Sequence, residues 1–449
     1  MTEDDLQRAH DIVNECPDEA LAICNDILNE HFDDTLAQRA LFMSGYIMME
    51  AERFGLAYNL FQRCAQLRPD ISDIWSNMGM CLEEHDAEKA KAMFEKAYKL
   101  DPKNYRALAN QGLMHLLTGG PEQCVELSKK AIRLCPDLVS ARHNLSLAQI
   151  MLRQWKAGWK GYADTLGVKH REARDYGVPD WNGEPGTVLV YGEQGVGDEI
   201  MFSSCLADLA KTNKIVFDCD SRLEGLFKRS FDFPVFGDRF KKQSRAADQK
   251  FDYQCAIGQL PSFYRNSDDS FPGTPYLNPD PERCIQWRAL FDTLPGMKIG
   301  IAWRGGLKNT GEARRSLQLS DFEPIFNNDD TFISLEYKPV PEEQLKRYNI
   351  KSYPRATAKG GDIDDLAALI NELDVVVTCC TAVFHIAGAL GKECHILTPS
   401  SPPYGMLKSG HLPWYNSVKT FRQKPGESWL SVVGRFREDV FDAARFHRC

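Results

Sequence analysis

A period of 33 or 34 residues in the first third of the chain constrains the fold more than any other feature. Gly45, Gly79 and Gly112 lie 34 and 33 residues apart, and small or large residues recur at fixed offsets after each of them. Leu41, Trp75 and Leu108 lie four residues before the glycines, and the sets that follow them are Ala57/Ala90/Cys124, Phe61/Phe94/Ser128, Cys64/Ala97/Ala131 and Pro69/Pro102/Pro136. One period accommodates two antiparallel helices, which cannot bury their apolar stripes without a neighbouring pair. The small residues allow close approach of the two helices, and proline ends the second one.

This pattern resembles tetratricopeptide repeats. The resemblance implies three clear units, a partial leading unit from about Ala9 to Phe32 and a degenerate fourth unit over 137–164. We therefore expect an all-α superhelix over residues 1–165. An ordinary helical bundle is the alternative, but columns that hold their phase over three units disfavour it. Stacked helical pairs form a concave groove that typically binds a peptide or another protein.

A different pattern begins after the turn-rich stretch 166–186, which we interpret as a linker. Short β-rich runs alternate with helical runs, which indicates parallel sheets with crossover helices. A break near 280–296 divides this region into two Rossmann-like halves, 187–290 and 296–449, and ligands in such sheets bind at the carboxyl ends of the strands. The expected strands are Thr187–Tyr191, Lys214–Phe217, Tyr253–Ile257, Lys298–Trp303, Thr331–Leu335, Asp374–Thr378 and Glu393–Leu397, and the expected helices include Glu199–Ala210, Asp321–Phe326, Asp362–Leu373 and Ala382–Leu390.

Charge and composition exclude several classes of protein. The net charge of −9 argues against a general nucleic-acid binder. We expect no membrane span, since no run approaches 18 apolar residues, and no signal peptide, since the acidic start lacks an apolar core. The 14 cysteines include no C-x-x-C pair, so free thiols in a reducing, cytoplasmic location are expected.

The first motif with chemical potential is the segment Tyr191–Glu199, between an expected strand and an expected helix. Gly195 and Gly197 permit a tight turn and close approach of a ligand to the backbone. Ile200 occupies the third glycine position of G-x-G-x-x-G, so the segment is not a dinucleotide fingerprint. Asp198 is placed to deprotonate an acceptor hydroxyl, although an acidic residue at a helix start also serves as a cap.

A second motif follows the strand Lys298–Trp303, where a glycine-rich loop carries Arg304, Arg314 and Arg315. Guanidinium groups match the geometry of phosphate oxygens, so this loop suits a diphosphate. A solvated basic loop is the alternative interpretation.

A third motif lies where the strand Asp374–Thr378 runs into a helix. Thr381 and Ala382 occupy its first turn, where unpaired N–H groups and the helix dipole favour an anion. His385 lies one turn further on the same face and is expected to reach the same anion, although a single histidine in an apolar helix is more often part of the core.

Two further acidic features follow strands. Glu336 is a candidate for ribose hydroxyls, with a solvated loop acid as the alternative. The triplets Asp218-Cys-Asp220 and Asp362-Ile-Asp364 have the form of a metal site for nucleotide sugars, but two such triplets in an acid-rich chain are near chance and Asp362 has the position of a helix cap. We expect no metal.

Residues from about 155 to 432 resemble the C-terminal half of bacterial and phage proteins that join tetratricopeptide repeats to a GT-B glycosyltransferase-like domain. The resembling segments are Trp181–Pro185, Gly192–Asp198, Trp303–Gly306, Arg315–Ser316, Phe332–Glu336, Thr381–Lys392, Pro413–Tyr415 and Phe421–Gln423. The layout is also similar to O-linked N-acetylglucosamine transferases, and the GT-B part to lipopolysaccharide heptosyltransferases. Both of these families invert at the anomeric carbon without a metal.

The similarity to heptosyltransferases implies roles for single residues. Asp198 matches their general base, Arg315 falls near their phosphate-binding lysine, and Glu336 falls near their ribose-binding glutamate. Thr381 and His385 match a threonine and a histidine that contact phosphate. The chain departs from the pattern twice, with Cys380 in place of an aspartate and Ala382 in place of glycine or serine.

The sequence thus predicts a cytoplasmic glycosyltransferase that uses a nucleotide-diphosphate sugar, with a UDP-sugar favoured and no other cofactor. The acceptor is expected to be a hydroxyl, and the repeats suggest the hydroxyl of a protein that they present, so protein glycosylation is the expected process. The main alternative is a non-catalytic repeat scaffold with a degenerate nucleotide-sugar-binding module. A dinucleotide oxidoreductase is disfavoured by the glycine spacing.

Overall fold

The structure, a computed structural model, describes residues 2–31, 35–83, 85–168, 171–306, 311–357, 360–400, 409, 412–424 and 426–442. The chain forms two compact units, Met1–Ala148 and Gln149–Cys449. The first unit therefore ends 17 residues before the predicted boundary at 165. The difference arises because the helix over 155–163 packs within the second unit.

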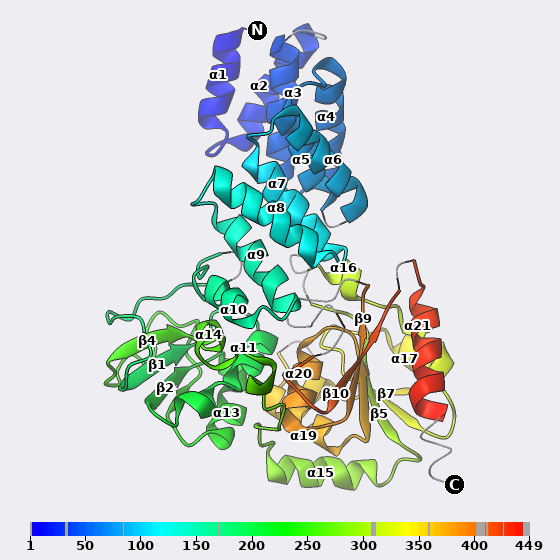
Figure 1. Cartoon of the computed structure of the whole chain (residues 1–449). Helices are drawn as coiled ribbons and strands as arrows, with labels where there is room; N and C mark the ends of the chain where they lie inside the picture. The colour runs from blue at the N-terminus through cyan, green and yellow to red at the C-terminus, as the bar shows by residue number, and fades with distance from the viewer. Residues whose placement is uncertain are drawn as a thin grey trace. The chain divides into compact units, whose positions relative to one another are not determined.

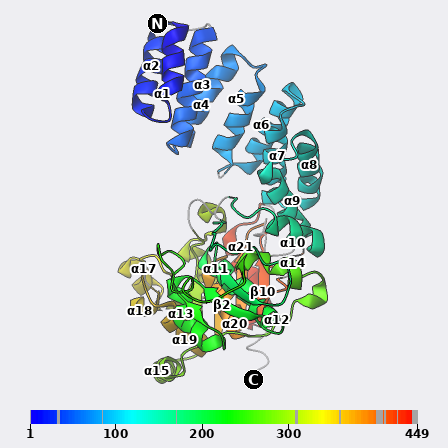
Figure 2. The same ribbon diagram turned by 90° about the vertical axis from the view of Figure 1, so that its left-hand side faces the viewer.

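The first unit is a succession of antiparallel helices (Figures 1 and 2). Proline at N1 starts two of them, and the side chains of Asp86 and Asn104 cap two others by accepting backbone N–H bonds. The helices are α1 (Glu3–Ile12), α2 (Pro17–Glu30), α3 (Thr35–Glu50), α4 (Phe54–Leu67), α5 (Ser72–Leu82), α6 (Ala87–Leu100), α7 (Tyr105–Leu117) and α8 (Pro121–Leu134), and α9 (Val139–Met151) crosses the boundary between the units.

The recurring glycines explain how each helical pair closes. A Cβ atom on Gly45 would lie 2.8 Å from the Phe61 ring, and one on Gly79 would lie 2.7 Å from the Phe94 ring. Both rings are fully buried. In the third unit Ser128 replaces the phenylalanine, and a Cβ on Gly112 would lie 3.3 Å from its Oγ. The period in the sequence therefore reflects the same close approach between two helices, repeated in each pair.

The second unit holds two parallel sheets, with α11 and α20 between them in Figure 1. The first has the order β3-β2-β1-β4. Its strands are β1 (Thr187–Tyr191), β2 (Lys214–Asp218), β3 (Val235–Phe236) and β4 (Tyr253–Ala256). Near-continuous apolar runs such as Val188–Tyr191 are buried, as expected for strands covered on both faces.

The second sheet has the order β10-β9-β8-β5-β6-β7, which is the doubly wound order 3-2-1-4-5-6. Its strands are β5 (Lys298–Ala302), β6 (Thr331–Ser334), β7 (Ile350–Ser352), β8 (Val375–Thr378), β9 (Cys394–Thr398) and β10 (Val418–Arg422). Because the strand order reverses between β5 and β8, a crevice is expected beyond their carboxyl ends. Ala302 of β5 pairs there with Thr378 of β8.

Helices and short turns connect these strands. The α-helices are α10 (Trp155–Ala163), α11 (Val196–Ser203), α12 (Leu206–Leu209), α13 (Glu224–Ser230), α14 (Pro261–Tyr264), α15 (Pro281–Phe291), α16 (Glu312–Arg315), α17 (Glu342–Arg347), α18 (Pro354–Thr357), α19 (Ile363–Glu372), α20 (Ala382–Leu390) and α21 (Trp429–Phe436). The 3₁₀ turns cover Ser221–Leu223, Ile257–Gln259, Asp268–Ser270 and Leu319–Ile325, and a π-helical turn covers Arg437–Asp442. The predicted helix Glu199–Ala210 is divided into α11 and α12, and Asp321–Phe326 is a 3₁₀ turn.

The described part of the predicted linker packs along the first sheet. Asp180 forms a parallel bridge with Gln254 of β4, and the Trp181 N–H donates to the Gln254 carbonyl at 2.8 Å. The Tyr176 hydroxyl donates to the Asp218 carboxylate at 2.9 Å. This segment is therefore part of the fold.

The helix α15 packs against α19 of the second half, although most of it lies in the range 187–290 that the sequence analysis assigned to the first half. Its Trp287 indole donates to Asp365 of α19 at 2.8 Å, and Arg288 pairs with Glu372 at 2.8 Å. In the sequence, this charged helical run before a strand indicated a boundary. In the structure, the buried face of α15 packs against α19.

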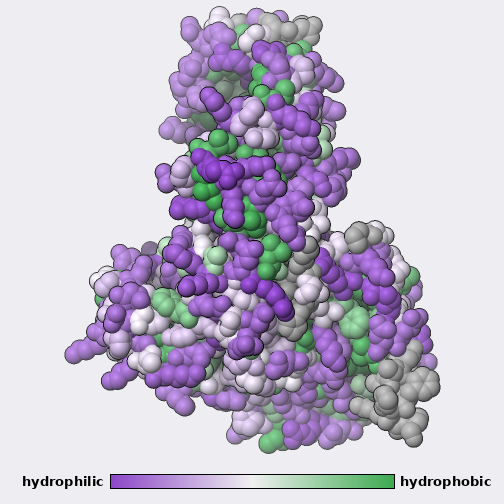
Figure 3. Space-filling view, in the orientation of Figure 1, coloured by the Kyte–Doolittle hydropathy of each residue, from purple (hydrophilic) through white to green (hydrophobic). Residues whose placement is uncertain are grey.

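The surface is mainly polar. On the face shown in Figure 3, hydrophilic side chains cover most of both units, and hydrophobic ones gather over the repeat helices. The exposed large apolar side chains include Tyr46 and Met80, each directly after a column glycine. Within the described ranges, we find no helix with the length and apolar character that a bilayer span requires.

Candidate functional site

Three candidate segments follow strands that flank the reversal of strand order in their sheets. The glycine loop, residues 192–198, follows β1, which lies between β2 and β4. The segment Trp303–Gly306 follows β5, and Cys379–Thr381 follows β8, its neighbour in the second sheet. The topology therefore places the second and third sequence motifs side by side.

The glycine loop also meets the first turn of α20. A Cβ atom on Gly197 would lie 2.9 Å from Cδ2 and 3.4 Å from Nε2 of His385, and 3.6 Å from the Cα of Ala382. Gly197 is therefore required by a close approach between the first turns of α11 and α20. This approach joins the first motif to the third.

The glycine loop is held from several sides. The buried Glu193 carboxylate pairs with Arg171 at 3.4 Å and accepts the Gly258 N–H at 3.2 Å. The Gln194 side chain accepts a hydrogen bond from the Tyr162 hydroxyl of α10 at 2.9 Å. Arg239 donates to the Gln194 carbonyl and pairs with the buried Glu199. The loop is thus fixed before any ligand arrives, which favours tight binding.

Asp198 lies in the first turn of α11 and is partly exposed. An acid at this position is stabilised by the helix dipole, so the capping interpretation and the catalytic one are both compatible with its place. The carboxylate also lies near Tyr415, whose pKa is raised well above its ordinary value by burial, by Tyr276 and by the negative charge of Asp198. Asp198 therefore belongs to the same cluster as α20.

Arg304 and Glu336 bind each other. The Glu336 carboxylate, 4% exposed, accepts the backbone N–H groups of Trp303 at 2.6 Å and Arg304 at 2.7 Å, and it pairs with the Arg304 Nε at 2.7 Å. The other Arg304 nitrogens donate to the carbonyls of Lys338 and Pro339 at 2.6 and 3.2 Å. In this structure both side chains order the loop after β5. Phosphate contact by Arg304 and ribose contact by Glu336 stay predictions.

Arg315 lies next to the turn after β8. Its positive charge opposes the effect of burial on the Cys380 thiol, whose pKa is nevertheless raised to about 12. The segment returns to β5, because the Leu317 N–H donates to the Trp303 carbonyl at 2.7 Å and Gly305 lies against the Arg315 backbone. Arg314 and Arg315 are both partly exposed at the end of α16. Lys308 of this loop lies outside the described residues.

The first turn of α20 has the features of an anion site. Thr381 is the N-cap, and its hydroxyl accepts the Val383 N–H at 3.2 Å and lies 3.4 Å from the Thr378 hydroxyl. Thr381, Ala382 and His385 are partly exposed. Burial lowers the pKa of His385 to about 3, so its imidazole is neutral at physiological pH. Cys380, by contrast, is a buried neutral thiol.

Aromatic side chains support this cluster. Trp414 packs edge-on against Trp159 of α10 and Phe202 of α11, with ring centroids 5.8 Å apart in both pairs. Tyr415 lies against Gly388 of α20, where an added Cβ would lie 2.4 Å from its ring. The sequence analysis gave no role to Trp414 or Tyr415 and placed the residues of α10 in a fourth repeat. For Trp414 and Tyr415, the segment Pro413–Tyr415 among the family resemblances was the available signal.

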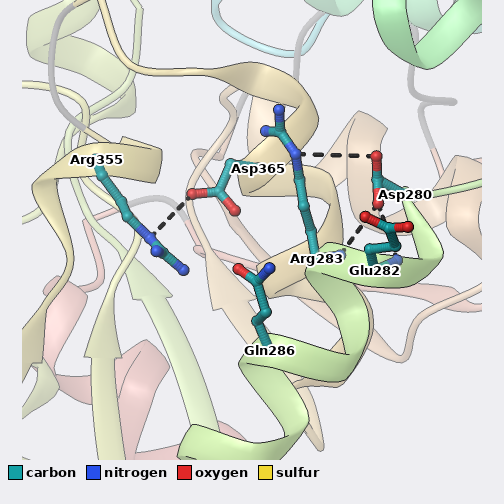
Figure 4. A pocket seen from close by; sticks show the side chains of 6 residues that line it. All are labelled: Asp280, Glu282, Arg283, Gln286, Arg355 and Asp365. Carbon is teal, nitrogen blue, oxygen red and sulfur yellow. Dashed lines mark hydrogen bonds and ion pairs between the residues drawn. The ribbon is translucent and has the colours of Figure 1, made fainter.

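A surface pocket of about 400 Å³ lies elsewhere in the second unit, between α15, α18 and α19 (Figure 4). Four of its charged groups are paired, since Arg355 contacts Asp365 at 3.2 Å and Arg283 contacts Asp280 at 4.0 Å. It includes none of the predicted site residues. Its full lining is Asp280, Glu282, Arg283, Gln286, Arg355 and Asp365.

The aspartate triplets have structural partners. Asp220 pairs with Arg222 at 2.8 Å, and Asp362 caps α19 and pairs with Arg283 at 2.5 Å. In the part of the chain that the structure describes, no three His, Cys, Asp or Glu side chains gather as a metal site. Metal independence stays a prediction.

These observations define a class: a helical-repeat unit followed by an α/β unit with two parallel sheets and a polar cluster at facing strand ends. A tetratricopeptide-repeat family model matches residues 73–104, which confirms the repeats. The chain is 26% identical over 427 residues to Protein FlbA of Caulobacter vibrioides, a match that covers 88% of this chain and 72% of the relative.

Solved structures resemble about a third of the chain. MamA 41-end from Desulfovibrio magneticus RS-1 is 19% identical, with a TM-score of 0.32, covering 36% of this chain and 93% of that one. Pseudomonas aeruginosa pilF is 17% identical, with a TM-score of 0.34 and coverages of 37% and 78%. YrrB, described as a TPR protein with an unusual peptide-binding site, is 17% identical, with a TM-score of 0.31 and coverages of 36% and 84%.

Proposed function

We propose that this chain is a metal-independent, inverting GT-B glycosyltransferase that moves a sugar from a nucleotide-diphosphate sugar, with UDP favoured, to an acceptor hydroxyl. One observation carries the proposal: the glycine loop with Asp198 lies against the first turn of α20, at Gly197 and His385. A general base and an anion site therefore lie next to each other, as transfer from a diphosphate leaving group requires.

The residues have distinct tasks in this mechanism. Arg315, the α20 N-terminus and Thr381 hold the diphosphate and stabilise its charge as the bond to the anomeric carbon breaks. The acceptor oxygen forms the new bond to that carbon from the opposite face, and its proton passes to the Asp198 carboxylate. Arg304 and Glu336 keep the loop after β5 in place.

The repeats supply a second binding surface. Helical pairs of this kind commonly hold a peptide or protein in their concave groove. We propose that the groove presents a protein acceptor or a partner, with protein glycosylation in the cytoplasm as the process. The class of acceptor is then decided by the first unit and the chemistry by the second.

A non-catalytic scaffold is the second candidate, and two observations favour it. Cys380 stands as a neutral buried thiol where the heptosyltransferase pattern has an aspartate. The Glu336 carboxylate already accepts hydrogen bonds from the N–H groups of Trp303 and Arg304. On this view the second unit binds a nucleotide sugar without turning it over.

Donor hydrolysis and transfer by the full chain separate the two candidates. A panel of UDP-, GDP- and ADP-sugars is first screened by thermal shift, since a bound ligand raises the melting temperature. We expect Asp198→Asn to keep that shift and to lower turnover by roughly 100-fold or more, in line with the loss of a general base. Asp269→Asn, at an exposed acid of a 3₁₀ turn, is the matched control. Equal turnover in both variants contradicts the catalytic role, and a shift without any turnover in the unmodified chain supports the scaffold.

A further inference from the structure

Tyr415 makes a specific polar contact that the proposed mechanism has not used. Its hydroxyl lies 3.0 Å from Nδ1 of His385, and the two rings meet edge to face with centroids 5.9 Å apart. The residue follows Trp414 in the segment that crosses α20. It therefore lies on the side of the His385 ring that faces away from Nε2.

The Tyr415 ring is locked in place by packing. It is 1% exposed, lies directly on the backbone of α20 at Gly388 and stacks with Tyr276 at 6.5 Å. The Tyr276 hydroxyl donates to the Ile200 carbonyl of α11 at 2.5 Å, and its N–H donates to the Ala389 carbonyl of α20 at 2.9 Å. Tyr276 thus connects α11 with α20 and stacks on Tyr415. The Tyr415 hydroxyl therefore has a fixed position relative to His385.

The protonation states of the pair follow from their surroundings. Burial raises the pKa of Tyr415 and lowers that of His385, so a neutral phenol faces a neutral imidazole. A phenol is the stronger donor and an imidazole nitrogen the stronger acceptor. The Tyr415 hydroxyl also has a hydrogen-bond partner in Tyr276, but a phenol oxygen is a weaker acceptor than an imidazole nitrogen. The favoured arrangement is therefore a hydrogen bond from the Tyr415 hydroxyl to Nδ1, which leaves the ring proton on Nε2.

We propose that Tyr415 is a positioning residue that holds His385 as the neutral Nε2–H tautomer, so that the ring donates a hydrogen bond to an anion bound beside the first turn of α20. The Cδ2–Nε2 edge of the ring faces Gly197, where the glycine loop meets α20. The inference rests on the proposed function for the identity of the anion, a nucleoside diphosphate. It gives His385 the task of a neutral donor rather than a cation.

The test reads the tautomer directly. The full chain is labelled with ¹⁵N-histidine, and His385→Gln assigns the resonances. We expect Nε2 of His385 to carry the proton and Nδ1 to carry none, and we expect Tyr415→Phe to populate the Nδ1–H form. The phenylalanine keeps the ring packed on Gly388, so the fold is preserved. Tyr353→Phe, which removes a hydroxyl from a tyrosine packed against Trp287 of α15, is the control and is expected to leave the tautomer unchanged.

Titration with UDP adds a second readout. Tyr415→Phe is expected to weaken UDP binding by about five-fold, the effect of about one lost hydrogen bond, whereas Tyr353→Phe is not. A proton on Nδ1 in the unmodified chain overturns the inference, as does an unchanged tautomer in Tyr415→Phe. A chain that shows the expected tautomer but binds no nucleotide contradicts the proposed function and the anion role while leaving the Tyr415–His385 bond intact.

Discussion

Arg304 and Glu336 show what a pattern of single residues leaves out. The sequence analysis assigned each of them to a ligand, because arginine suits phosphate and an acid at a strand end suits ribose. The two lie 32 residues apart, and in the fold they pair at 2.7 Å. The two loops meet because β5 and β6 are neighbours in the sheet. A pattern of residue types does not predict which strands are neighbours. By contrast, Thr381 and His385 share one helix, so their common face followed from the helical period.

His385 also predicts a dependence of stability on pH. Its pKa is lowered from 6.5 to about 3 by burial. Below pH 6.5 the imidazole therefore binds a proton in the unfolded chain but stays neutral in the folded chain. The neutral ring therefore contributes stability above pH 6.5 that is lost as pH falls toward 3. We expect His385→Gln to lose less unfolding free energy between pH 7 and pH 5 than the unmodified chain, measured by urea unfolding at both pH values. An identical loss in the two chains would falsify this assignment.

Gly197 predicts a second effect of a single residue. Alanine there places a methyl group 2.9 Å from the His385 ring, so the first turns of α11 and α20 have to separate. We expect Gly197→Ala to cost about 1–3 kcal/mol of stability through overpacking and to weaken nucleotide binding. Gly195→Ala is the control, because the nearest atom to its added Cβ is the flexible Asp198 carboxylate at 3.3 Å. Equal melting temperatures for the two variants would show that the close approach does not hold.

Among the secondary-structure elements, long regular ones followed from the sequence and short edge ones did not. The predicted bounds of β1 and α20 agree with the structure, since an apolar run and a capped apolar helix are strong local signals. Two of the missed strands are short, β3 with two residues and β7 with three, and the third missed strand, β10, lies at the sheet edge. These strands are set by pairing with their neighbours, and their own side chains alternate little.

The repeat helices predict a graded response to alanine. At Gly79 an added methyl meets the rigid Phe94 ring at 2.7 Å, whereas at Gly112 it meets the smaller Ser128 side chain at 3.3 Å. We expect Gly79→Ala to lower the unfolding free energy of the repeat unit by about 1–3 kcal/mol. Gly112→Ala should change it by less, and urea unfolding followed by circular dichroism compares the two. A larger loss at Gly112 contradicts the proposed role of the glycine–phenylalanine contact.

The helix α10 makes a prediction about truncation. Trp159 is fully buried against Phe202 and Trp414, and Tyr162 holds Gln194 in the glycine loop. A chain over 149–449 should therefore unfold cooperatively, whereas one over 166–449, cut at the boundary that the sequence suggested, should melt at a lower temperature or aggregate. Calorimetry of both pieces checks this. If both melt alike, α10 is not part of the second unit.

In the whole molecule, a unit of helical repeats is followed by an α/β unit in which three segments converge. The convergence of the glycine loop, Arg315 and the α20 N-terminus is a property of two sheets together. The sequence indicated each loop and its place at a strand end, because alternating strands and helices imply parallel sheets. It did not reveal the supporting layer of α10, Arg239 and Tyr415, because those contacts come from segments distant in the chain.

The most direct test of the central claim is the affinity of the full chain for UDP, measured by isothermal titration calorimetry in the unmodified protein and in Arg315→Gln. A charge-assisted hydrogen bond to phosphate contributes about 1.5–3 kcal/mol, so we predict that binding weakens by about 10- to 100-fold. Arg347→Gln, at an exposed arginine of α17, is the control and should bind as the unmodified chain does. No binding of any nucleoside diphosphate, or equal affinity in all three proteins, would contradict the account.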